Sequence, residues 1–370
     1  MNLINENLKN IDKQLNKVTK RFSLVNINPI NKYKDFNSKI NDDYAYNKPK
    51  FSLKVMKKQL NQMNIEDKDF LSRQIKKKRE ELRKKISLIE NVGTDEFTKT
   101  SKRLYPYPNK KILKNAYKVL ELKPSKQEEE TLDSKEIIKY FKKVLKHLKL
   151  DYKVNVVEMI TKARVLAIQK KLELKKNTFF GEEYTNRLLI HEIGTHIFRS
   201  EGGKLQSLNI FSTGFADYLE IEEGLAAYNE LKHGVLDTNI LRNYAGRVVA
   251  VDIARREGLE GVYEELTRFF DEKTSENIAI RVKRGVKNPQ DPGGYTKDIV
   301  YFTGLFEVLK NINEEKYKFL YKGKFSIKDI RYLKKYNLEH NPFKPTMLLE
   351  HLNKPKHNNF LDEESIKEFI

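Results

Sequence analysis

The sequence predicts an α+β fold that is mostly helical and contains one small β-sheet. Apolar residues recur at helical spacing through much of the 370-residue chain, and 39% of its residues are hydrophobic, as in folded globular proteins. Two segments in the middle, 152–160 and 163–176, instead carry alternating β-branched residues that are typical of strands or a hairpin. No segment repeats at a fixed period, which argues against a solenoid or a propeller.

The chain divides into three regions by composition. Residues 1–45 are polar and rich in Asn and Lys, which predicts a tail or a loosely docked helix. Residues 46–130 are expected to be a helical region, in which 52–92 has the pattern of a helical hairpin. The stretch 125–133, SKQEEETLD, has the composition of a linker, so we expect the last region to be 131–370.

The elements of the last region follow one another in a simple order. A helix begins at Ser134, which can cap it, and carries one apolar stripe. The two predicted strands come next, and the sheet precedes a helix that starts near Gly181. From there almost only helices are expected, at about 219–233, 239–257, 259–271 and 296–312, with short ones after.

Composition limits the functional classes. The net charge of +20 would attract a polyanion, either nucleic acid or an acidic polypeptide tail, but it is also what a Lys-rich chain with solvated faces would show. No nucleic-acid-binding motif accompanies the charge, so nucleic acid is not the expected partner. No apolar stretch is long enough for a membrane span, and the N-terminus does not resemble a secretory signal. Cysteine is absent, and we expect a cytoplasmic protein.

One short motif, HEIGTH, carries chemistry. His191, Glu192 and His196 stand as His-Glu-x-x-x-His, one residue longer than the common zinc-peptidase signature. On a regular α-helix, residues five apart point about 140° away from each other, so the two imidazoles cannot meet one metal ion. We therefore predict a local widening such as a π-bulge. Gly194 lies inside this stretch at a cost of about 1 kcal/mol in a helix, and it would ease the distortion.

A third ligand is expected from the helix at 218–230, YLEIEEGLAAYNE. Glu222 and Glu223 lie there beside Gly224 and two alanines, and small residues let helices approach closely. Position alone does not separate the two glutamates. Since there is no cysteine, Zn²⁺ would be held by two histidines and one carboxylate, which leaves a position open for water. Glu192 would then activate the water and carry its proton. The alternative is a helix with two surface histidines and an ion-paired glutamate.

The motifs HEIGTH and EEGLA together resemble the microtubule-associated tyrosine carboxypeptidase family, whose members carry Gln-Glu-Gly-Leu-Ala. Similar stretches are found at 97–108, 212–230 and 293–308, in the expected order, so the resemblance runs from about residue 45 to about 350. It implies a metallopeptidase that removes the C-terminal residue, tyrosine or another aromatic, from a peptide or protein tail. The tubulin specificity of the characterised animal members is not carried over.

The resemblance also implies roles for single residues. His191, His196 and Glu223 become the zinc ligands, and Glu192 becomes the catalytic acid and base. Glu222 stands where the family usually has Gln, which adds a negative charge beside the metal. Region 131–370 is then the catalytic domain.

A carboxypeptidase must also hold the terminal carboxylate of its substrate. Arg247, in an apolar helix, and Lys297, after a Gly-Gly turn, are the candidate cations. The alternatives are an ion pair of Arg247 with Asp252 or Glu222, and a solvated Lys297.

Two tyrosines in the same stretch are candidates to stabilise the developing charge of the reaction. Tyr301 joins Lys297 as a catalytic candidate, and Tyr295 joins Arg247 and Lys297 as a substrate-binding candidate, although tyrosines in such a chain are more often core residues. Gly202 and Gly203 are expected at the hinge of a loop.

Three functions remain open at this point. The first is a zinc carboxypeptidase, the second a zinc peptidase or amidase of another cleavage specificity, and the third a non-catalytic basic binding protein. For the first, the basic charge favours an acidic C-terminal tail as the substrate. The sequence does not predict the oligomeric state.

Overall fold

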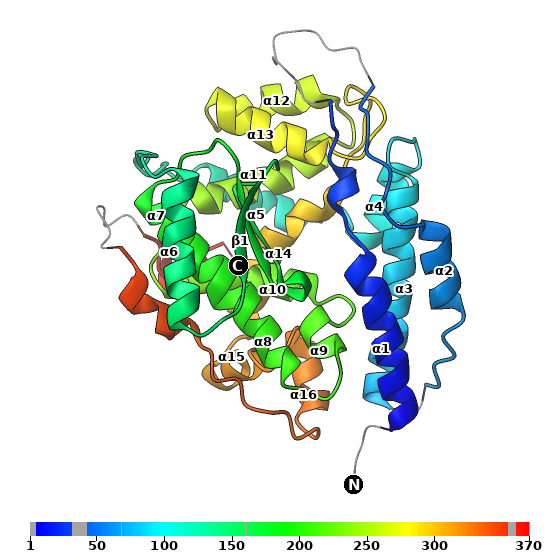
Figure 1. Cartoon of the computed structure of the whole chain (residues 1–370). Helices are drawn as coiled ribbons and strands as arrows, with labels where there is room; N and C mark the ends of the chain where they lie inside the picture. The colour runs from blue at the N-terminus through cyan, green and yellow to red at the C-terminus, as the bar shows by residue number, and fades with distance from the viewer. Residues whose placement is uncertain (1–4, 32–42, 68, 160, 354–359, 370) are drawn as a thin grey trace.

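The computed structural model describes residues 5–31, 43–67, 69–159, 161–353 and 360–369, and confirms the mostly helical α+β fold (Figure 1). Its buried apolar residues form one continuous core that extends from Leu8 to Phe369. Because this core includes residues on both sides of position 130, the boundary there stays a prediction. None of the described helices is long and apolar enough to cross a membrane.

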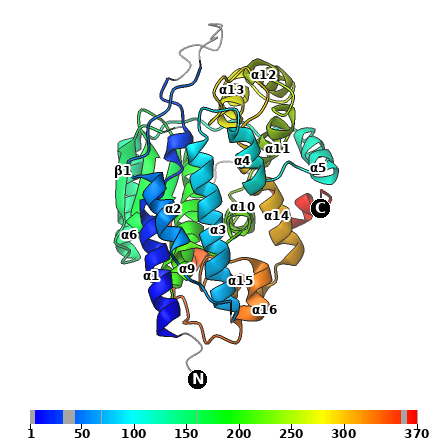
Figure 2. The same ribbon diagram turned by 90° about the vertical axis from the view of Figure 1, so that its right-hand side faces the viewer.

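Three helices of the N-terminal part stand side by side at the right-hand edge of the molecule in Figure 1, the side that faces the viewer in Figure 2: α1 (Glu6–Arg21), α2 (Leu53–Asn61) and α3 (Phe70–Glu90). The pair α2 and α3 is the predicted hairpin. Helix α1 is docked more firmly than a tail, because Val18 is 1% exposed and Asp12 accepts a hydrogen bond from the backbone N–H of Ile210 at 2.9 Å. The predicted tail also includes residues 1–4 and 32–42, which lie outside the described residues.

The sheet has three strands, not two. Segment 163–176 contains both β2 (Ala163–Leu166) and β3 (Lys171–Lys175), which pair antiparallel and are joined by a single 3₁₀ turn, η2 (Ala167–Gln169). Strand β1 (Lys153–Val157) pairs with β3 in parallel, which gives the order β1-β3-β2. Helix α6 (Ser134–His147), capped by Asp133, contacts β1 and β3.

The centre of the molecule is built on one continuous helical segment that changes its winding. It consists of α7 (Glu182–Leu188), the π-helix η3 (Leu189–Ile197) and α8 (Phe198–Lys204). Helix α10 (Leu219–Lys232) contacts η3 and packs tightly on α14 (Val300–Asn311).

Two glycines allow the close approach of α10 and α14. A Cβ atom added to Gly224 would lie 2.1 Å from the carbonyl carbon of Gly304. The small residues beside Glu223 therefore allow α14 to pack closely against α10. From the sequence alone, this role was expected only toward the helix that carries the histidines.

The remaining elements lie around these helices, and two of them, α9 and α13, fall outside the helices predicted from the sequence. They are η1 (Val25–Ile27), α4 (Phe97–Leu104), α5 (Lys110–Leu120), α9 (Ile210–Thr213), α11 (Thr238–Ile253), α12 (Leu259–Thr267), α13 (Glu272–Val282), η4 (Thr296–Ile299), α15 (Glu314–Leu320), η5 (Ile327–Asp329), α16 (Ile330–Leu333), η6 (Pro345–His351) and α17 (Glu363–Lys367).

The expectation of a loop hinge at Gly202 and Gly203 is wrong. Both residues lie within helix α8, and a Cβ atom on Gly202 would be 1.9 Å from the carbonyl oxygen of Tyr321. These glycines serve close packing of α8 against its neighbours.

Candidate metal centre and active site

The helix that carries HEIGTH is widened where the spacing of the histidines requires it. Residues Leu189–Ile197 form a π-helix, and the rings of His191 and His196 lie with their centroids 4.9 Å apart. The predicted distortion is thus confirmed. A π-helix has about 4.4 residues per turn, so a side chain five positions on returns nearly to the same face.

Side chains from other elements support the backbone of this widened stretch. The hydroxyl of Tyr321 donates a hydrogen bond to the carbonyl oxygen of Gly194 at 2.9 Å. Asn229 of α10 donates to Thr195 Oγ1 at 2.7 Å, and Thr195 in turn donates to the carbonyl of Ile190 at 3.3 Å. These bonds satisfy buried polar groups around the irregular turns, which would otherwise be costly.

The two histidines and one glutamate converge. The Nε2 atom of His191 lies 3.7 Å from Glu223 Oε2, and the Nε2 atom of His196 lies 3.6 Å from the same oxygen. In a tetrahedral zinc site with bonds of about 2.0–2.1 Å, neighbouring ligand atoms are about 3.4 Å apart. Glu223 Oε2 is buried and has no hydrogen-bond partner among the described residues. The three side chains therefore fit a divalent metal ion.

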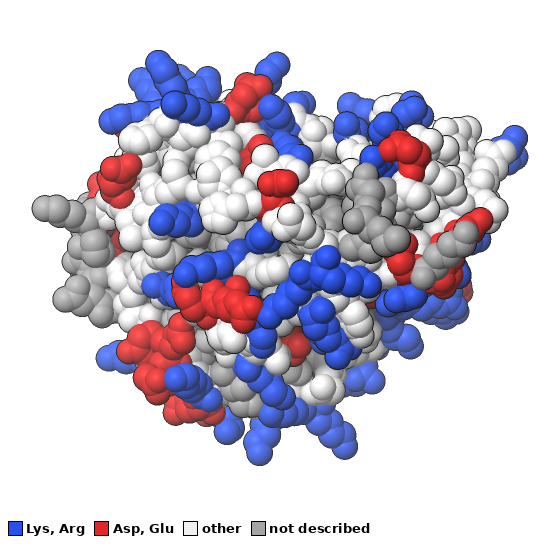
Figure 3. Space-filling view, turned by 90° about the horizontal axis from the view of Figure 1, so that it is seen from below, with Lys and Arg blue, Asp and Glu red and all other residues white. Residues whose placement is uncertain are grey.

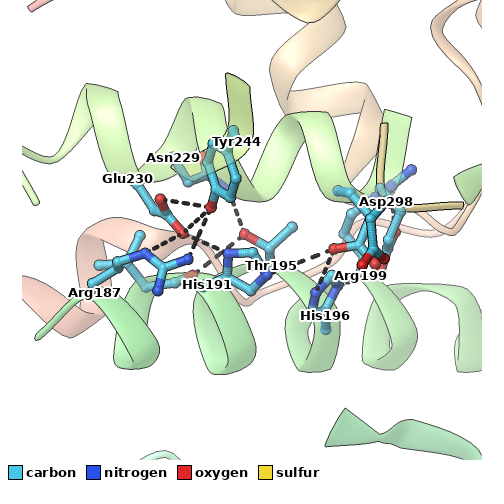
Figure 4. Close-up of polar contacts among 12 residues, drawn as sticks. Arg187, His191, Thr195, His196, Arg199, Asn229, Glu230, Tyr244 and Asp298 are labelled. Atoms are coloured by element: carbon cyan, nitrogen blue, oxygen red, sulfur yellow. Dashed lines mark hydrogen bonds and ion pairs between the residues drawn. The ribbon is translucent and has the colours of Figure 1, made fainter. Parts of the chain in front are cut away.

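A second carboxylate contacts the Nδ1 atom of each imidazole. His191 Nδ1 is 2.6 Å from Glu230 Oε1, as Figure 4 shows. His196 Nδ1 is 2.9 Å from Glu222 Oε1. A carboxylate at Nδ1 fixes the proton on that nitrogen and leaves Nε2 as the free ligand atom. In both rings the Nε2 atom is the one that faces Glu223.

The contacts of Glu222 and Glu223 distinguish the two residues, whereas the sequence alone left open which of them would be the third ligand. Besides His196, Glu222 contacts Arg199 and Lys324, the latter at 2.6 Å. Burial alone would raise the pKa of Glu222, but these two cations hold it well below its usual range. They also compensate for the negative charge of Glu222.

Glu230 is supported in the same way. Arg187 Nε lies 3.0 Å from Glu230 Oε1, and the hydroxyl of Tyr244 donates to Glu230 Oε2 at 3.1 Å. Burial alone would raise the pKa of Glu230, but Arg187 and His191 lower it.

Sequence reasoning missed these supporting groups, although one signal was present. Arg187 stands four residues before His191, and Arg199 stands three after His196, so each basic residue shares a helix face with a histidine.

Glu192 and Lys297 lie close to the three-residue cluster. Glu192 is 7% exposed and makes no hydrogen bond with a described residue, so its carboxylate is not committed to a structural partner. Lys297 Nζ is 4.0 Å from Glu223 Oε1 and 6.0 Å from the centre of the Tyr301 ring. The structure thus brings Lys297 and Tyr301 close to the cluster of His191, His196 and Glu223.

Arg247 lies over two tyrosines and has no ion pair with a described residue. Its guanidinium carbon is 4.7 Å from the centre of the Tyr301 ring and 5.4 Å from that of Tyr244. Neither expected acidic partner is free to bind it, because Asp252 pairs with Arg255 at 3.1 Å and Glu222 is held by Arg199 and Lys324.

Tyr295 is placed differently from Tyr301. It is 3% exposed, and its ring packs against Phe97 and Tyr105, each with centroids 6.0 Å away. These contacts are those of a core residue, so a substrate-binding role for Tyr295 stays a prediction that its surroundings do not support.

A basic groove, which we call the α3 groove, runs along helix α3. It consists of two hollows of about 350 Å³ and about 410 Å³ that share Glu80, Lys84 and Arg103. The second hollow reaches Ala216 and Asp217, just before helix α10 begins. Elsewhere on the surface, in the view from below of Figure 3, basic side chains are spread widely and alternate with clusters of acidic ones. The cations that line the groove are Lys57, Arg73, Lys76, Lys77, Arg83, Lys84 and Arg103.

The fold and the site define a mostly helical α+β protein with a buried two-histidine, one-glutamate cluster that fits a divalent metal ion. The family model described as microtubule-associated tyrosine carboxypeptidase matches residues 33–365, and the chain belongs to this family.

Individual relatives are more distant. The chain is 29% identical over 203 residues to the human protein named "Putative tyrosine carboxypeptidase MATCAP2", across 51% of this chain and 38% of the relative. It is 25% identical over 193 residues to "Microtubule-associated tyrosine carboxypeptidase 1" of Mus musculus, across 50% of this chain and 40% of the relative. The alignments thus span about two fifths of these relatives.

Proposed function

We propose that this protein is a zinc-dependent carboxypeptidase that removes the C-terminal residue, tyrosine or another aromatic, from a peptide or protein tail. The observation that carries the proposal is the convergence of His191 Nε2 and His196 Nε2 on Glu223 Oε2, at 3.7 Å and 3.6 Å. Membership of a family whose relatives are named tyrosine carboxypeptidases supports the reaction class.

His191, His196 and Glu223 would hold the zinc ion, with Glu230 and Glu222 fixing the imidazoles. When bound, zinc supplies a Lewis acid that lowers the pKa of water and polarises the scissile carbonyl. Glu192 accepts a proton from the attacking water and delivers it to the leaving amine. Its lack of a structural hydrogen bond to described residues supports this role.

Tyr301 is suited to stabilise the oxyanion of the tetrahedral intermediate. Burial, together with Glu223, raises the pKa of its hydroxyl to about 12. Tyr301 therefore stays protonated at neutral pH and can donate a hydrogen bond to the oxyanion. Lys297, 4.0 Å from Glu223, adds positive charge at the same place.

Arg247 and Lys297 would bind the terminal carboxylate of the substrate. A guanidinium free of acidic partners can receive a carboxylate in bidentate fashion, and Arg247 is the group near the cluster that meets this condition. The ring of Tyr301, which is partly exposed, offers aromatic surface beside it, while Tyr244, stacked behind Tyr301 with centroids 5.4 Å apart, is buried. This surface supports a preference for an aromatic C-terminal residue.

Arg247, a cation that can bind a terminal carboxylate, suits cleavage at the C-terminus of a chain. It therefore favours a carboxypeptidase over the alternative, a zinc peptidase or amidase of another specificity. The uncommitted Glu192 carboxylate counts against the other alternative, a non-catalytic basic binding protein.

The preceding residues of the tail would run along the α3 groove. The hollow of about 350 Å³ contains four cations, Lys57, Arg83, Lys84 and Arg103, against one acid, Glu80. The hollow that reaches Ala216 has five cations against four acids, so the positive excess of the groove lies mainly in the first hollow. We therefore propose that the tail is acidic. Reversing charge in the double variant Lys84→Glu and Arg103→Glu should raise KM for acidic tails about tenfold at low salt and leave neutral tails unchanged. Equal rates on both kinds of tail in the native protein would contradict this part.

The reaction itself is tested by mass spectrometry of a mixed peptide library incubated with the zinc-loaded protein. We expect loss of single C-terminal residues, aromatic ones fastest, and no cleavage of peptides with a C-terminal amide. Glu192→Gln should bind zinc normally and release nothing. Internal cleavage products would favour the alternative peptidase, and an unchanged library would favour the binding protein.

A further inference from the structure

A second group of metal-ligating side chains lies outside the site described above. His147 ends helix α6, and Glu350 and His351 end the 3₁₀ segment η6. The Nε2 atom of His147 is 3.5 Å from Glu350 Oε1, and that of His351 is 3.7 Å from the same oxygen. One ligand atom from each residue lies within 4.8 Å of the others. We propose that these three residues bind a second divalent transition-metal ion, with zinc the natural occupant.

The geometry of this group resembles that of the proposed catalytic centre. The two imidazoles have centroids 4.9 Å apart with an interplanar angle of 86°, compared with 4.9 Å and 79° for His191 and His196. In both groups one carboxylate oxygen lies between two Nε2 atoms. Two imidazoles and one carboxylate are a common ligand set for zinc, and no sulfur ligand is required.

His351 Nε2 provides an independent indication. This atom is buried, and the His351 side chain as a whole is only 12% exposed. Even so, the atom has no hydrogen-bond partner among the described residues. A buried polar atom without a partner is costly, and a metal ion would satisfy it. His147 and Glu350 are 57% and 63% exposed, so an ion can enter from solvent and water can complete its coordination.

The metal would fasten the C-terminal segment behind the catalytic helix. Segment η6 lies against the π-helix, because Leu348 Cδ1 is 3.0 Å from the place of a Cβ on Gly194. Just beyond His351, Asn353 and Asn186 of α7 exchange two hydrogen bonds of 2.8 Å. An ion that joins η6 to α6 would therefore stabilise the segment that covers η3. This role is structural and involves no chemical step.

The test is zinc content after equilibrium dialysis of the full chain against micromolar Zn²⁺. We expect about two ions per chain in the native protein, about one in His147→Ala and about one in Glu223→Ala, because each substitution removes one site. His147 is exposed, so its variant should fold. His340→Ala, at another exposed histidine, is the matched control and should keep the native content. A native content in His147→Ala would overturn the proposal.

A second readout separates this site from the catalytic one. In the Glu223→Ala background, zinc should still raise Tm by several degrees, and adding His147→Ala should abolish that rise. If the catalytic proposal failed, Glu223→Ala would have no effect on zinc content, while the loss caused by His147→Ala would remain. A zinc-dependent rise in Tm that persists in the double variant would overturn the second site.

Discussion

The Nδ1 atom of His196 lies 2.9 Å from Oε1 of Glu222, the residue that directly precedes Glu223. Adjacent glutamates on one helix thus reach opposite sides of the same imidazole. Glu222 holds the ring in place, and Glu223 lies 3.6 Å from its Nε2 atom. The same pattern, with Glu230 in the supporting role, recurs at His191.

The two adjacent glutamates should respond differently to substitution. Glu223→Gln removes a charged ligand and should abolish zinc binding with little loss of stability. Glu222→Gln should keep zinc but weaken its affinity about 10–100-fold, because the ligand histidine loses its supporting carboxylate. It should also cost about 3 kcal/mol of unfolding free energy, since Arg199 and Lys324 remain buried without a counter-charge. Zinc titration and urea unfolding measure both effects, and equal zinc affinities in the two variants would contradict the assignment.

Arg247→Lys should lower kcat/KM about 10–100-fold, mainly through KM, on peptides with a free C-terminus. Lysine keeps the charge but cannot make the paired hydrogen bonds of a guanidinium, and charged hydrogen bonds contribute about 1.5–3 kcal/mol each. The matched control is Arg255→Lys, whose side chain is 47% exposed and pairs with Asp252. Steady-state kinetics distinguish them, and native kinetics in Arg247→Lys would show that another cation binds the carboxylate.

Gly224→Ala should destabilise the protein by about 3 kcal/mol or more, because its methyl group would overlap the backbone of α14. The expected relief, a separation of α10 from α14, would also move the neighbouring Glu223 and weaken zinc binding. Gly234→Asn is a suitable control, since no atom lies within 4 Å of its Cβ position and Asn tolerates its φ of +64°. Thermal unfolding measures the difference, and a normal Tm in Gly224→Ala would contradict the close contact.

His233 should make the free energy of unfolding decrease as the pH becomes acidic. Burial, with help from Lys232, lowers the pKa of His233 to about 4, below its ordinary value of 6.5. Between these values the unfolded chain binds more protons than the folded one, so this contribution is complete above pH 6.5 and is lost as pH falls toward 4.

The test of this contribution compares the native protein with His233→Gln in urea between pH 7.5 and pH 4.5. The native protein should lose on the order of 2 kcal/mol more than the variant over this interval. Parallel pH profiles would exclude the contribution of His233.

The distorted helix was predictable from the sequence because the constraint is local. Two histidines five positions apart cannot share a face of a regular α-helix, whatever surrounds them. The pairing of β1 with β3 was not predictable, because alternation of residues indicates a strand and does not specify its partner. The same limit applies to Glu230, which is 39 positions from His191 and meets it only through the packing of α10 on η3. Tyr295 and Tyr301 looked alike in one motif, yet one packs in the core and the other lies by the cluster.

The wide turns of η3 also set the rotational phase of helix α8. Deleting Gly194 would give the shorter His-Glu-x-x-His spacing, and rewinding of this stretch as an α-helix would keep the direction of every later residue, because five residues of a π-helix and four of an α-helix each complete about one turn. Arg199 would still face Glu222, and Gly202 would still face Tyr321, where larger side chains have no room. The extra residue of the long spacing is therefore absorbed within η3, and the hydrogen bond that Tyr321 donates to the carbonyl of Gly194 is the contact that the short form would have to replace.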